Sequence, residues 1–166
     1  MLQPDISTLE ALRAQAGKEI FVTDWVVMSQ TRIDQFAQAT GDFQWIHVDA
    51  ARAAKESPFG CTIAHGFLTL SLIGKFYDDH FTLPFCEMGI NYGLNKVRFT
   101  NPVKVDSRVR GRCVLQSISD IEGGLQLAFA ITIEIEGQTK PACIAESVVR
   151  QYFKKTGDAA SAGKAV

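Results

Sequence analysis

The chain has 166 residues, and its 17 lysines and arginines against 18 aspartates and glutamates give a formal net charge of -1. This length predicts one domain with a sizeable core, and the balanced charge argues against nucleic acid or an anionic membrane as a general partner. There is no charged-then-apolar leader and no apolar run long enough to cross a membrane, and the four cysteines follow no disulfide pattern, so we expect a cytoplasmic protein.

Two elements are predicted before residue 30. Ser7 and Glu10 have the spacing of a capping box, in which each side chain bonds a free backbone amide at the start of a helix. We therefore expect a helix over residues 7–16. Residues 21–28, which are rich in valine and aromatic side chains, are expected to form the first strand.

A second short helix, over residues 31–40, is predicted to lead into a polar loop. Thr31 and Asp34 have capping-box spacing at its start, and Gly41 stands where helices commonly end in a left-handed residue. Asp42 and His47 follow in the loop, and we predict that they form an acid/base pair, because an imidazole titrates near neutral pH. The simpler explanation is turn chemistry, in which the aspartate caps backbone amides and the histidine fills a half-buried gap.

A longer helix is predicted over residues 63–81, where apolar side chains occur on nearly every side, as expected for a helix in a core. Gly66, near its start, costs about 1 kcal/mol of helix stability relative to alanine, so another requirement must favour it. Its amide would lack an intrahelical partner and, with no side chain in the way, could donate to a ligand oxyanion. The alternative is that glycine allows close packing against a strand.

The chain beyond residue 88 is predicted to be rich in β-strand. From residue 125 to residue 135 the odd positions are large and apolar and the even ones small or polar, which indicates a half-buried strand. It is expected to pair with residues 108–117 and with residues 142–153 through glycine-containing turns. We therefore predict an α+β domain over residues 1–155, with the buried helix on one face of an antiparallel sheet. Residues 156–166, rich in alanine, glycine and serine, are predicted to be a flexible tail.

A metal site is the alternative interpretation of the polar loop. Asp42, His47 and Asp49 could together ligate a divalent ion, and His65 could supply a fourth ligand. No cysteine pair and no His-x-x-x-His spacing supports this alternative, so we expect neither a metal nor another cofactor.

The segment over residues 29–71 resembles the signature of the MaoC-like, (R)-specific enoyl-CoA hydratase family. In that family the pattern Gly-Asp-x-Asn-Pro-x-His is followed downstream by a His-Gly motif and often by a serine. The matching residues are Gly41, Asp42 and His47 in the first motif and His65, Gly66 and Ser71 in the second. Gln44 and Trp45 stand where the family usually has asparagine and proline, which resembles hydratase-like and nodulation-protein-like branches of the same superfamily.

The resemblance implies the hot-dog fold, a sheet wrapped around one central helix, and a homodimer whose two sheets join edge to edge with the active site at or near the interface. It also implies a hydro-lyase that adds water to a trans-2-enoyl thioester of coenzyme A or an acyl carrier protein, forming the (R)-3-hydroxyacyl thioester. Asp42 and His47 would bind and activate the water, and the Gly66 amide would hold the thioester carbonyl. Ser71 would orient the carboxylate or the water, and Gln44 would present its amide near them.

Two other functions stay open on the sequence. A hot-dog thioesterase would hold the same carbonyl but hydrolyse the thioester, and an acyl-binding subunit would keep the fold without turnover. The spacing of Asp42 and His47 favours hydration. Basic residues after the central helix could bind the phosphates of coenzyme A, although charged strand residues ordinarily face water. They are Lys96, Arg98, Lys104, Arg108, Arg110 and Arg112.

Overall fold

The computed structural model describes residues 4–155, so the tail predicted over residues 156–166 lies outside the described residues. Within the described range the chain forms five helices and six strands. The helices are α1 (Leu9–Arg13), α2 (Gln30–Thr40), α3 (Trp45–Val48), α4 (Ala50–Glu56) and α5 (Gly66–His80). The strands are β1 (Glu19–Val22), β2 (Val26–Val27), β3 (Cys86–Phe99), β4 (Arg108–Ile121), β5 (Gly124–Ile135) and β6 (Cys143–Phe153).

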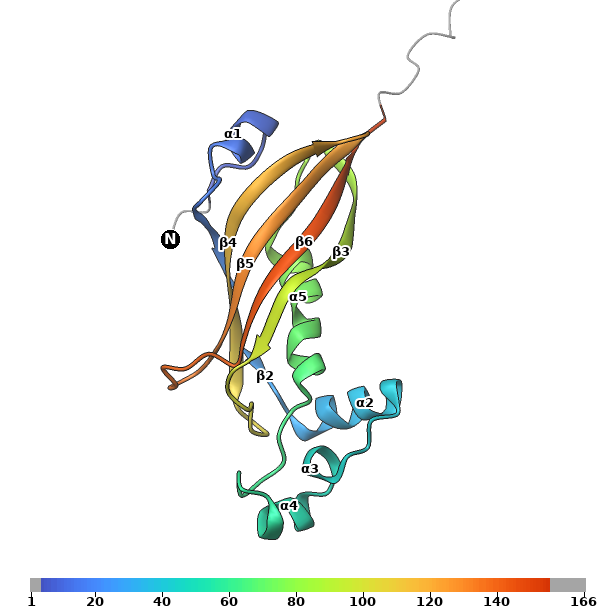
Figure 1. The fold of residues 1–166 in the computed structure, drawn as a ribbon, viewed down its shortest axis with the longest axis vertical. Coiled ribbons are helices and arrows are strands. Elements are labelled where there is room, and N and C mark those ends of the chain that lie inside the picture. The colour runs from blue at the N-terminus through green and yellow to red at the C-terminus, as the bar shows by residue number, and fades with distance from the viewer. Residues whose placement is uncertain (1–3, 156–166) are drawn as a thin grey trace, which may run out of the picture.

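The strands form one antiparallel sheet in the order β1-β4-β5-β6-β3, with β2 also beside β4. β5 pairs along its length with both β4 and β6, so the predicted meander is confirmed. Its two turns contain Gly123 at φ 71° and Gly137 at φ 72°, left-handed conformations that other residues rarely adopt. β3 lies at one end of the strand order and forms an edge of the sheet (Figure 1).

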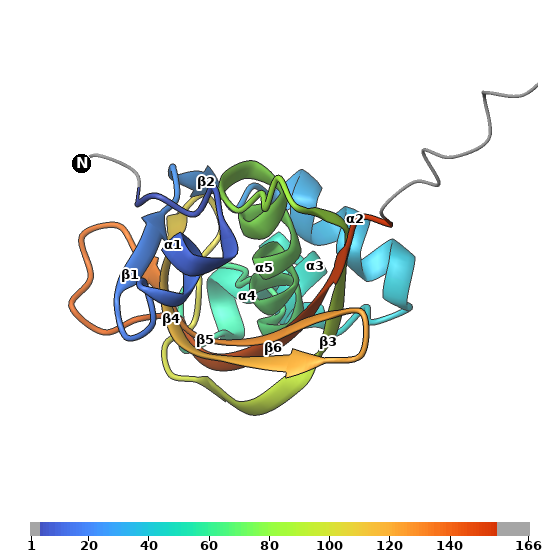
Figure 2. The same cartoon turned by 90° about the horizontal axis from the view of Figure 1, so that it is seen from above.

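The sheet curves around α5, which lies in its hollow (Figure 2). Every odd residue of β5 from 125 to 135 is buried toward this helix, and the ring of Tyr77 on α5 contacts that of Phe129 at 5.3 Å between centroids. Gly111 on β4 leaves room for Phe76, because a Cβ atom there would lie 2.5 Å from the Phe76 ring. The predicted α+β architecture, an antiparallel sheet wrapped around a buried central helix, is confirmed.

The start of α2 differs from the prediction, whereas its end does not. Ser29, not Thr31, caps the helix, because the Ser29 hydroxyl oxygen accepts a hydrogen bond from the Arg32 amide at 3.3 Å. Gly41 ends the helix in a left-handed conformation at φ 76°, and its amide donates to the carbonyl of Ala37 at 2.8 Å. The chain therefore turns sharply at the predicted glycine.

Two other helices are shorter than predicted. Thr8 caps α1 in place of Ser7, whose hydroxyl donates to the Asp5 carboxylate instead. The central helix begins at Gly66, because Ile63 is extended and forms a bridge with Lys104. No helix in the described part of the chain combines the length and apolar character that crossing a bilayer requires.

The strand predicted over residues 21–28 is interrupted and forms two pieces, β1 and β2. Val22 pairs with Arg112 on β4, whereas Val26 pairs with Val109. Between these two pairs the chain from β1 to β2 has one residue more than β4. The extra residue interrupts the hydrogen bonding with β4, as a β-bulge does. The sequence pattern could not reveal this extra residue, because both pieces have strand-like composition.

The segment from α2 to α4 lies beyond the N-terminal end of α5 (Figure 1). Gln30 of α2 holds this segment together. Its amide nitrogen donates to the His47 carbonyl at 2.8 Å, and its amide oxygen accepts from the Thr62 hydroxyl at 2.6 Å. These bonds join α2, α3 and the segment that leads into α5, so the polar loop after α2 faces the start of the central helix.

Candidate active site

Asp42 follows the left-handed glycine and lies at the surface of the isolated chain. Its carboxylate accepts a hydrogen bond from the Gln44 amide at 3.3 Å, and its side chain is 54% exposed. The turn chemistry considered from the sequence is therefore present, because the aspartate does cap a backbone amide. The same bond fixes the direction of the carboxylate without burying it, so its oxygens remain accessible and can orient a water molecule.

His47 comes from the single turn of α3 and is buried, with only 7% of the residue exposed. Its Nδ1 lies 2.7 Å from the Ile63 carbonyl oxygen, which can only accept, so Nδ1 carries the proton. Nε2 of the neutral ring then has a free lone pair. Burial lowers the pKa of His47; the Ile63 carbonyl and Asp42 oppose this lowering, and His65 adds to it. The environment thus favours the neutral, proton-accepting ring.

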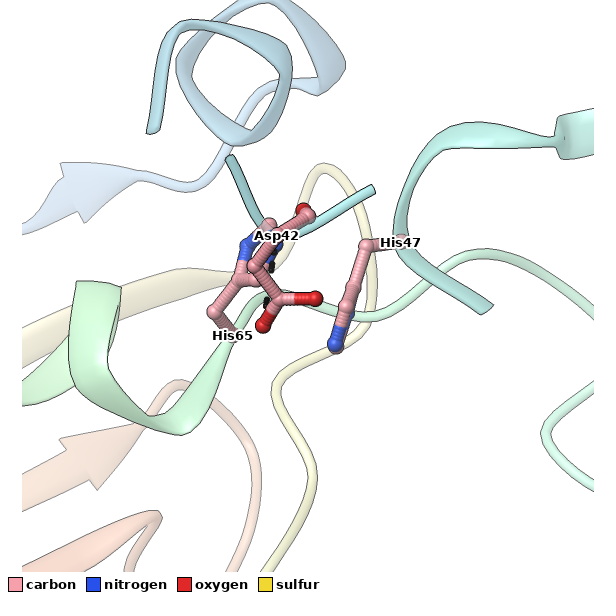
Figure 3. Close-up of side chains that lie close together, drawn as sticks. All are labelled: Asp42, His47 and His65. Atoms are coloured by element: carbon pink, nitrogen blue, oxygen red, sulfur yellow. Dashed lines mark hydrogen bonds and ion pairs between the residues drawn. The ribbon is translucent and has the colours of Figure 1, made fainter. Parts of the chain in front are cut away.

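His65 contacts both predicted residues, and Figure 3 shows its ring close to Asp42, with His47 on the other side of the carboxylate. It is the residue before α5, and only 2% of it is exposed. Its Nε2 lies 3.0 Å from the carbonyl oxygen of Asp42 and 4.0 Å from the carboxylate of the same residue, and its ring stacks on that of His47 at 3.8 Å. Sequence reasoning gave His65 no role beyond a possible metal ligand, although its place in the His-Gly motif was a usable signal.

Gly66 is the first residue of α5, where backbone amides have no intrahelical partner. It lines a pocket of about 310 Å³ together with His47, Thr69 and Phe99. A Cβ atom on Gly66 would lie 3.1 Å from the ring of Phe99, which is closer than side chains normally approach. Glycine therefore does allow close packing against a strand, and the same residue, at the start of the helix, lines the pocket that His47 shares.

Ser71 and Gln44 do not share this pocket. The Ser71 hydroxyl donates to the Leu68 carbonyl at 2.8 Å, and the residue lines a second pocket of about 300 Å³ between α5 and β3. Five residues of α-helix turn the side-chain direction by about 140°, so Gly66 and Ser71 face different sides of α5. Gln44 is exposed, and its side chain forms no capping bond at the start of α3.

The metal alternative involves a subset of the predicted ligands. Asp42, His47 and His65 each offer a ligand atom within 4.8 Å of the others. Asp49 is directed elsewhere, because its carboxylate accepts the Arg52 amide at 2.9 Å and caps α4. Both ring systems already use one nitrogen on a backbone carbonyl, and the half-exposed carboxylate is available. The cluster fits proton transfer between a neutral imidazole and a carboxylate without a metal, and it also offers three ligand atoms.

Three of the six basic residues after α5 belong to an ion-paired strand face. Arg108, Arg110 and Arg112 each pair with a glutamate across the sheet, and Arg112 pairs with two. The guanidinium group of Arg110 also lies over the ring of Trp25, at 4.5 Å from the centroid. These contacts support the solvated-face explanation for the three arginines.

Comparison with known proteins gives consistent similarities. The family model described as MaoC like domain matches residues 12–133. The 3-hydroxyacyl-thioester dehydratase Z of Mycobacterium tuberculosis (strain ATCC 25618 / H37Rv) is 50% identical over 140 residues, which cover 84% of this chain and 92% of that protein. Nodulation protein N of Rhizobium leguminosarum bv. viciae is 47% identical over 149 residues, covering 88% and 92%. The solved (R)-hydratase from A. caviae has a TM-score of 0.68 at 22% identity, covering 81% of this chain and 94% of that one.

Proposed function

Because the chain belongs to the MaoC-like dehydratase family, we propose that it interconverts a trans-2-enoyl thioester and water with the (R)-3-hydroxyacyl thioester. One observation carries this proposal. A half-exposed carboxylate, Asp42, and a buried imidazole, His47, offer an oxygen and a ring nitrogen within 4.8 Å of each other. A single water molecule can accept and donate hydrogen bonds across such a gap. Hydration of this alkene requires a positioned water, a proton acceptor and a hold on the carbonyl.

In the proposed hydration, His47 Nε2 takes one proton from the water while the Asp42 carboxylate accepts a hydrogen bond from the other O–H. The water oxygen forms its bond to the β carbon, and the alkene electrons move toward the thioester carbonyl oxygen. The imidazolium then returns the proton to the α carbon, so both groups end in their starting state. Dehydration follows the same steps in reverse. The buried ring, whose pKa is lowered by that burial, suits this cycle because it is neutral before and after it.

The enolate oxygen needs a hydrogen-bond donor, and we assign this role to the Gly66 amide. It is the first amide of α5, a helix of 15 residues whose positive end faces the pocket shared with His47. Aligned peptide dipoles add to the attraction for developing negative charge at this end. Because Gly66 has no side chain, nothing on this residue would keep the thioester carbonyl of the substrate away from the amide.

The acyl chain fits best in the second pocket, between α5 and β3. Its walls include Phe67, Leu70 and Leu94, and its volume is about 300 Å³. Predominantly apolar walls with a few polar groups are typical of sites for such ligands. In this proposal Ser71, which lines the same pocket, contacts the acyl chain, and Gln44 contributes only through its backbone bond to Asp42.

We also propose a homodimer joined through the edge strand β3. Large apolar side chains that would normally be buried are exposed along this strand and next to it on β6, and a free strand edge can pair with a second copy. They are Met88, Ile90, Tyr92, Leu94 and Phe99 on β3, and Ile144 on β6. A second copy at this edge would lie beside the pocket between α5 and β3.

The cysteines support a reducing compartment, and we propose the cytoplasm. Four cysteines are free in the described chain. Burial raises the pKa of Cys143 to about 11, which keeps this thiol protonated and unreactive at neutral pH. Free thiols of this kind persist where disulfides are not formed.

A spectrophotometric assay with crotonyl-CoA and longer 2-enoyl thioesters tests the proposed reaction. We expect loss of the enoyl-thioester absorbance without release of free thiol. Thiol release with the alkene intact would identify a thioesterase, and no change in either signal at any chain length would identify a binding protein. Either result would overturn the proposal.

A further inference from the structure

His65 is among the most enclosed polar side chains at the site, and the proposed hydration does not use it. Its ring lies between the ring of His47 at 3.8 Å and that of Phe36 at 5.0 Å. Because only 2% of the residue is exposed, its position is set by packing on both faces. It is therefore held more firmly than the half-exposed carboxylate of Asp42 beside it.

The hydrogen bond of His65 defines its tautomer. The Asp42 carbonyl oxygen, 3.0 Å from Nε2, can only accept, so Nε2 carries the proton and Nδ1 has the lone pair. In the described chain this Nδ1 is buried and forms no hydrogen bond. An unsatisfied buried nitrogen is unfavourable, and a carbon atom there would remove the penalty. A side chain that served only to fill space would be better replaced by phenylalanine.

We infer that His65 is a positioning residue for the dyad: its Nε2–H fixes the backbone at Asp42, and its ring is the surface on which the His47 imidazole stacks. This inference rests on the proposed hydratase function for its kinetic consequence, but the geometry exists without it. One side chain thereby sets both members of the pair. The bond from Nε2–H fixes the backbone from which the Asp42 side chain extends. The stacking sets the plane of the His47 ring and therefore the direction of its Nε2.

The charged state of the stack is limited by the same geometry. Two protonated rings with centroids 3.8 Å apart would repel strongly in a buried site. The titratable groups that act on His47 are His65 and Asp42, while the neighbouring Gln30 and Thr62 side chains are neutral. The stack therefore carries at most one positive charge during turnover, which arises when His47 takes a proton from water.

Two substitutions separate the contacts of His65. His65→Phe keeps the aromatic surface and removes the donor, whereas His65→Gln keeps an N–H near the Nε2 position and removes the surface. We expect each to lower kcat about 10- to 100-fold with little change in KM, because small misplacement of a reacting group has effects of that size. His80→Phe is the matched control, since His80 also stacks on an aromatic ring, Phe21, at 5.5 Å, and occupies the opposite end of α5. It should retain the kcat of the unaltered protein.

NMR titration of the His47 imidazole provides a readout that needs no enzymatic activity. In both His65 variants the titration midpoint of His47 should rise, because a titratable ring that lowers it has been removed. His65→Phe should in addition shift the amide resonance of Asp42 or its neighbours. If the variants fold, and the titration midpoint and kcat match those of the control, the inference is wrong. If the titration shifts while the unaltered protein hydrates no thioester, the positioning role stands and the proposed function fails.

Discussion

The backbone of Gly66 lies against the ring of Phe99, so that an added Cβ atom would be 3.1 Å from that ring. The contact joins the start of the central helix to the end of β3 and places both residues in the pocket that contains His47. Two explanations for the glycine therefore concern the same missing Cβ atom: tight packing against Phe99, and access of a ligand to the Gly66 amide. Substitution can separate them.

Gly66→Ala should leave stability nearly unchanged while activity falls. Alanine gains about 1 kcal/mol of helix propensity, and the contact with Phe99 offsets part of this gain. We expect a change below about 1 kcal/mol in the free energy of unfolding, measured in urea, and a loss of at least about tenfold in kcat, because the methyl group crowds the oxyanion donor. The double variant Gly66→Ala/Phe99→Leu relieves the contact. Recovery of full activity in it would show that packing alone required the glycine.

Replacing either member of the dyad should affect chemistry more than folding. Asp42→Asn keeps an oxygen that can accept the Gln44 amide, so stability should change by less than about 0.5 kcal/mol, as at other surface positions. The variant loses the anionic acceptor, and kcat for enoyl-thioester hydration should fall about 100- to 10,000-fold. His47→Ala should lose a similar factor and some stability. An Asp42→Asn enzyme with native kcat would remove the carboxylate from the mechanism.

Sequence patterns predicted the strands of the sheet well, but they placed the start of α5, beside the site, only approximately. β5 was identifiable because alternation of buried and exposed residues is a local property, and its glycine turns fix both neighbours. The start of α5 was misplaced because Ile63 is apolar in an extended segment as well as in a helix. No local pattern distinguishes these two states, since the bridge to Lys104 that decides between them is formed across the fold.

The site residues show the same limit. Asp42 and His47 were predicted from their motif, and the structure brings them together with His65, which the sequence suggested only as a motif residue and a possible metal ligand. The stack between the two histidines depends on how the segment before α5 meets α3, and that contact is tertiary. Ser71 was placed beside the dyad by resemblance, whereas the rotation of the helix directs it into the neighbouring pocket.

Divalent ions should be unnecessary for turnover. Treatment with EDTA, followed by gel filtration and metal analysis, should leave kcat with crotonyl-CoA unchanged, because the proposed steps use only His47, Asp42 and a backbone amide. Mock-treated protein is the control. A loss of activity that is restored by adding back one particular ion would instead assign Asp42, His47 and His65 to a catalytic metal site.

The stability of the protein should fall as the pH drops below about 6.5, the ordinary pKa of histidine. Burial lowers the pKa of His47 in the folded state, so on acidification the unfolded chain takes up this proton first. The contribution of neutral His47 is present above the unfolded pKa and is lost between that value and the folded pKa, by about 1.4 kcal/mol per unit of lowering.

Urea unfolding at several pH values between 8 and 5 measures this dependence. His47→Gln should show a weaker decrease over this range, and His80→Gln, the control, should follow the unaltered protein. An equal decrease in all three proteins would assign the pH dependence to other groups.

The proposed dimer is joined through β3, so a charge introduced on this strand should dissociate the dimer. Ile90 is 43% exposed on the edge strand, and Ile90→Arg would place a cation in an apolar interface, where an unpaired charge is strongly unfavourable. We expect sedimentation velocity to give a dimer for the unaltered protein and a monomer for the variant at the same concentration. Val27→Arg is the matched control, because Val27 is similarly exposed, at 46%, on β2 rather than on the β3 edge. If Ile90→Arg stays dimeric, or if both variants dissociate, the interface does not lie on β3.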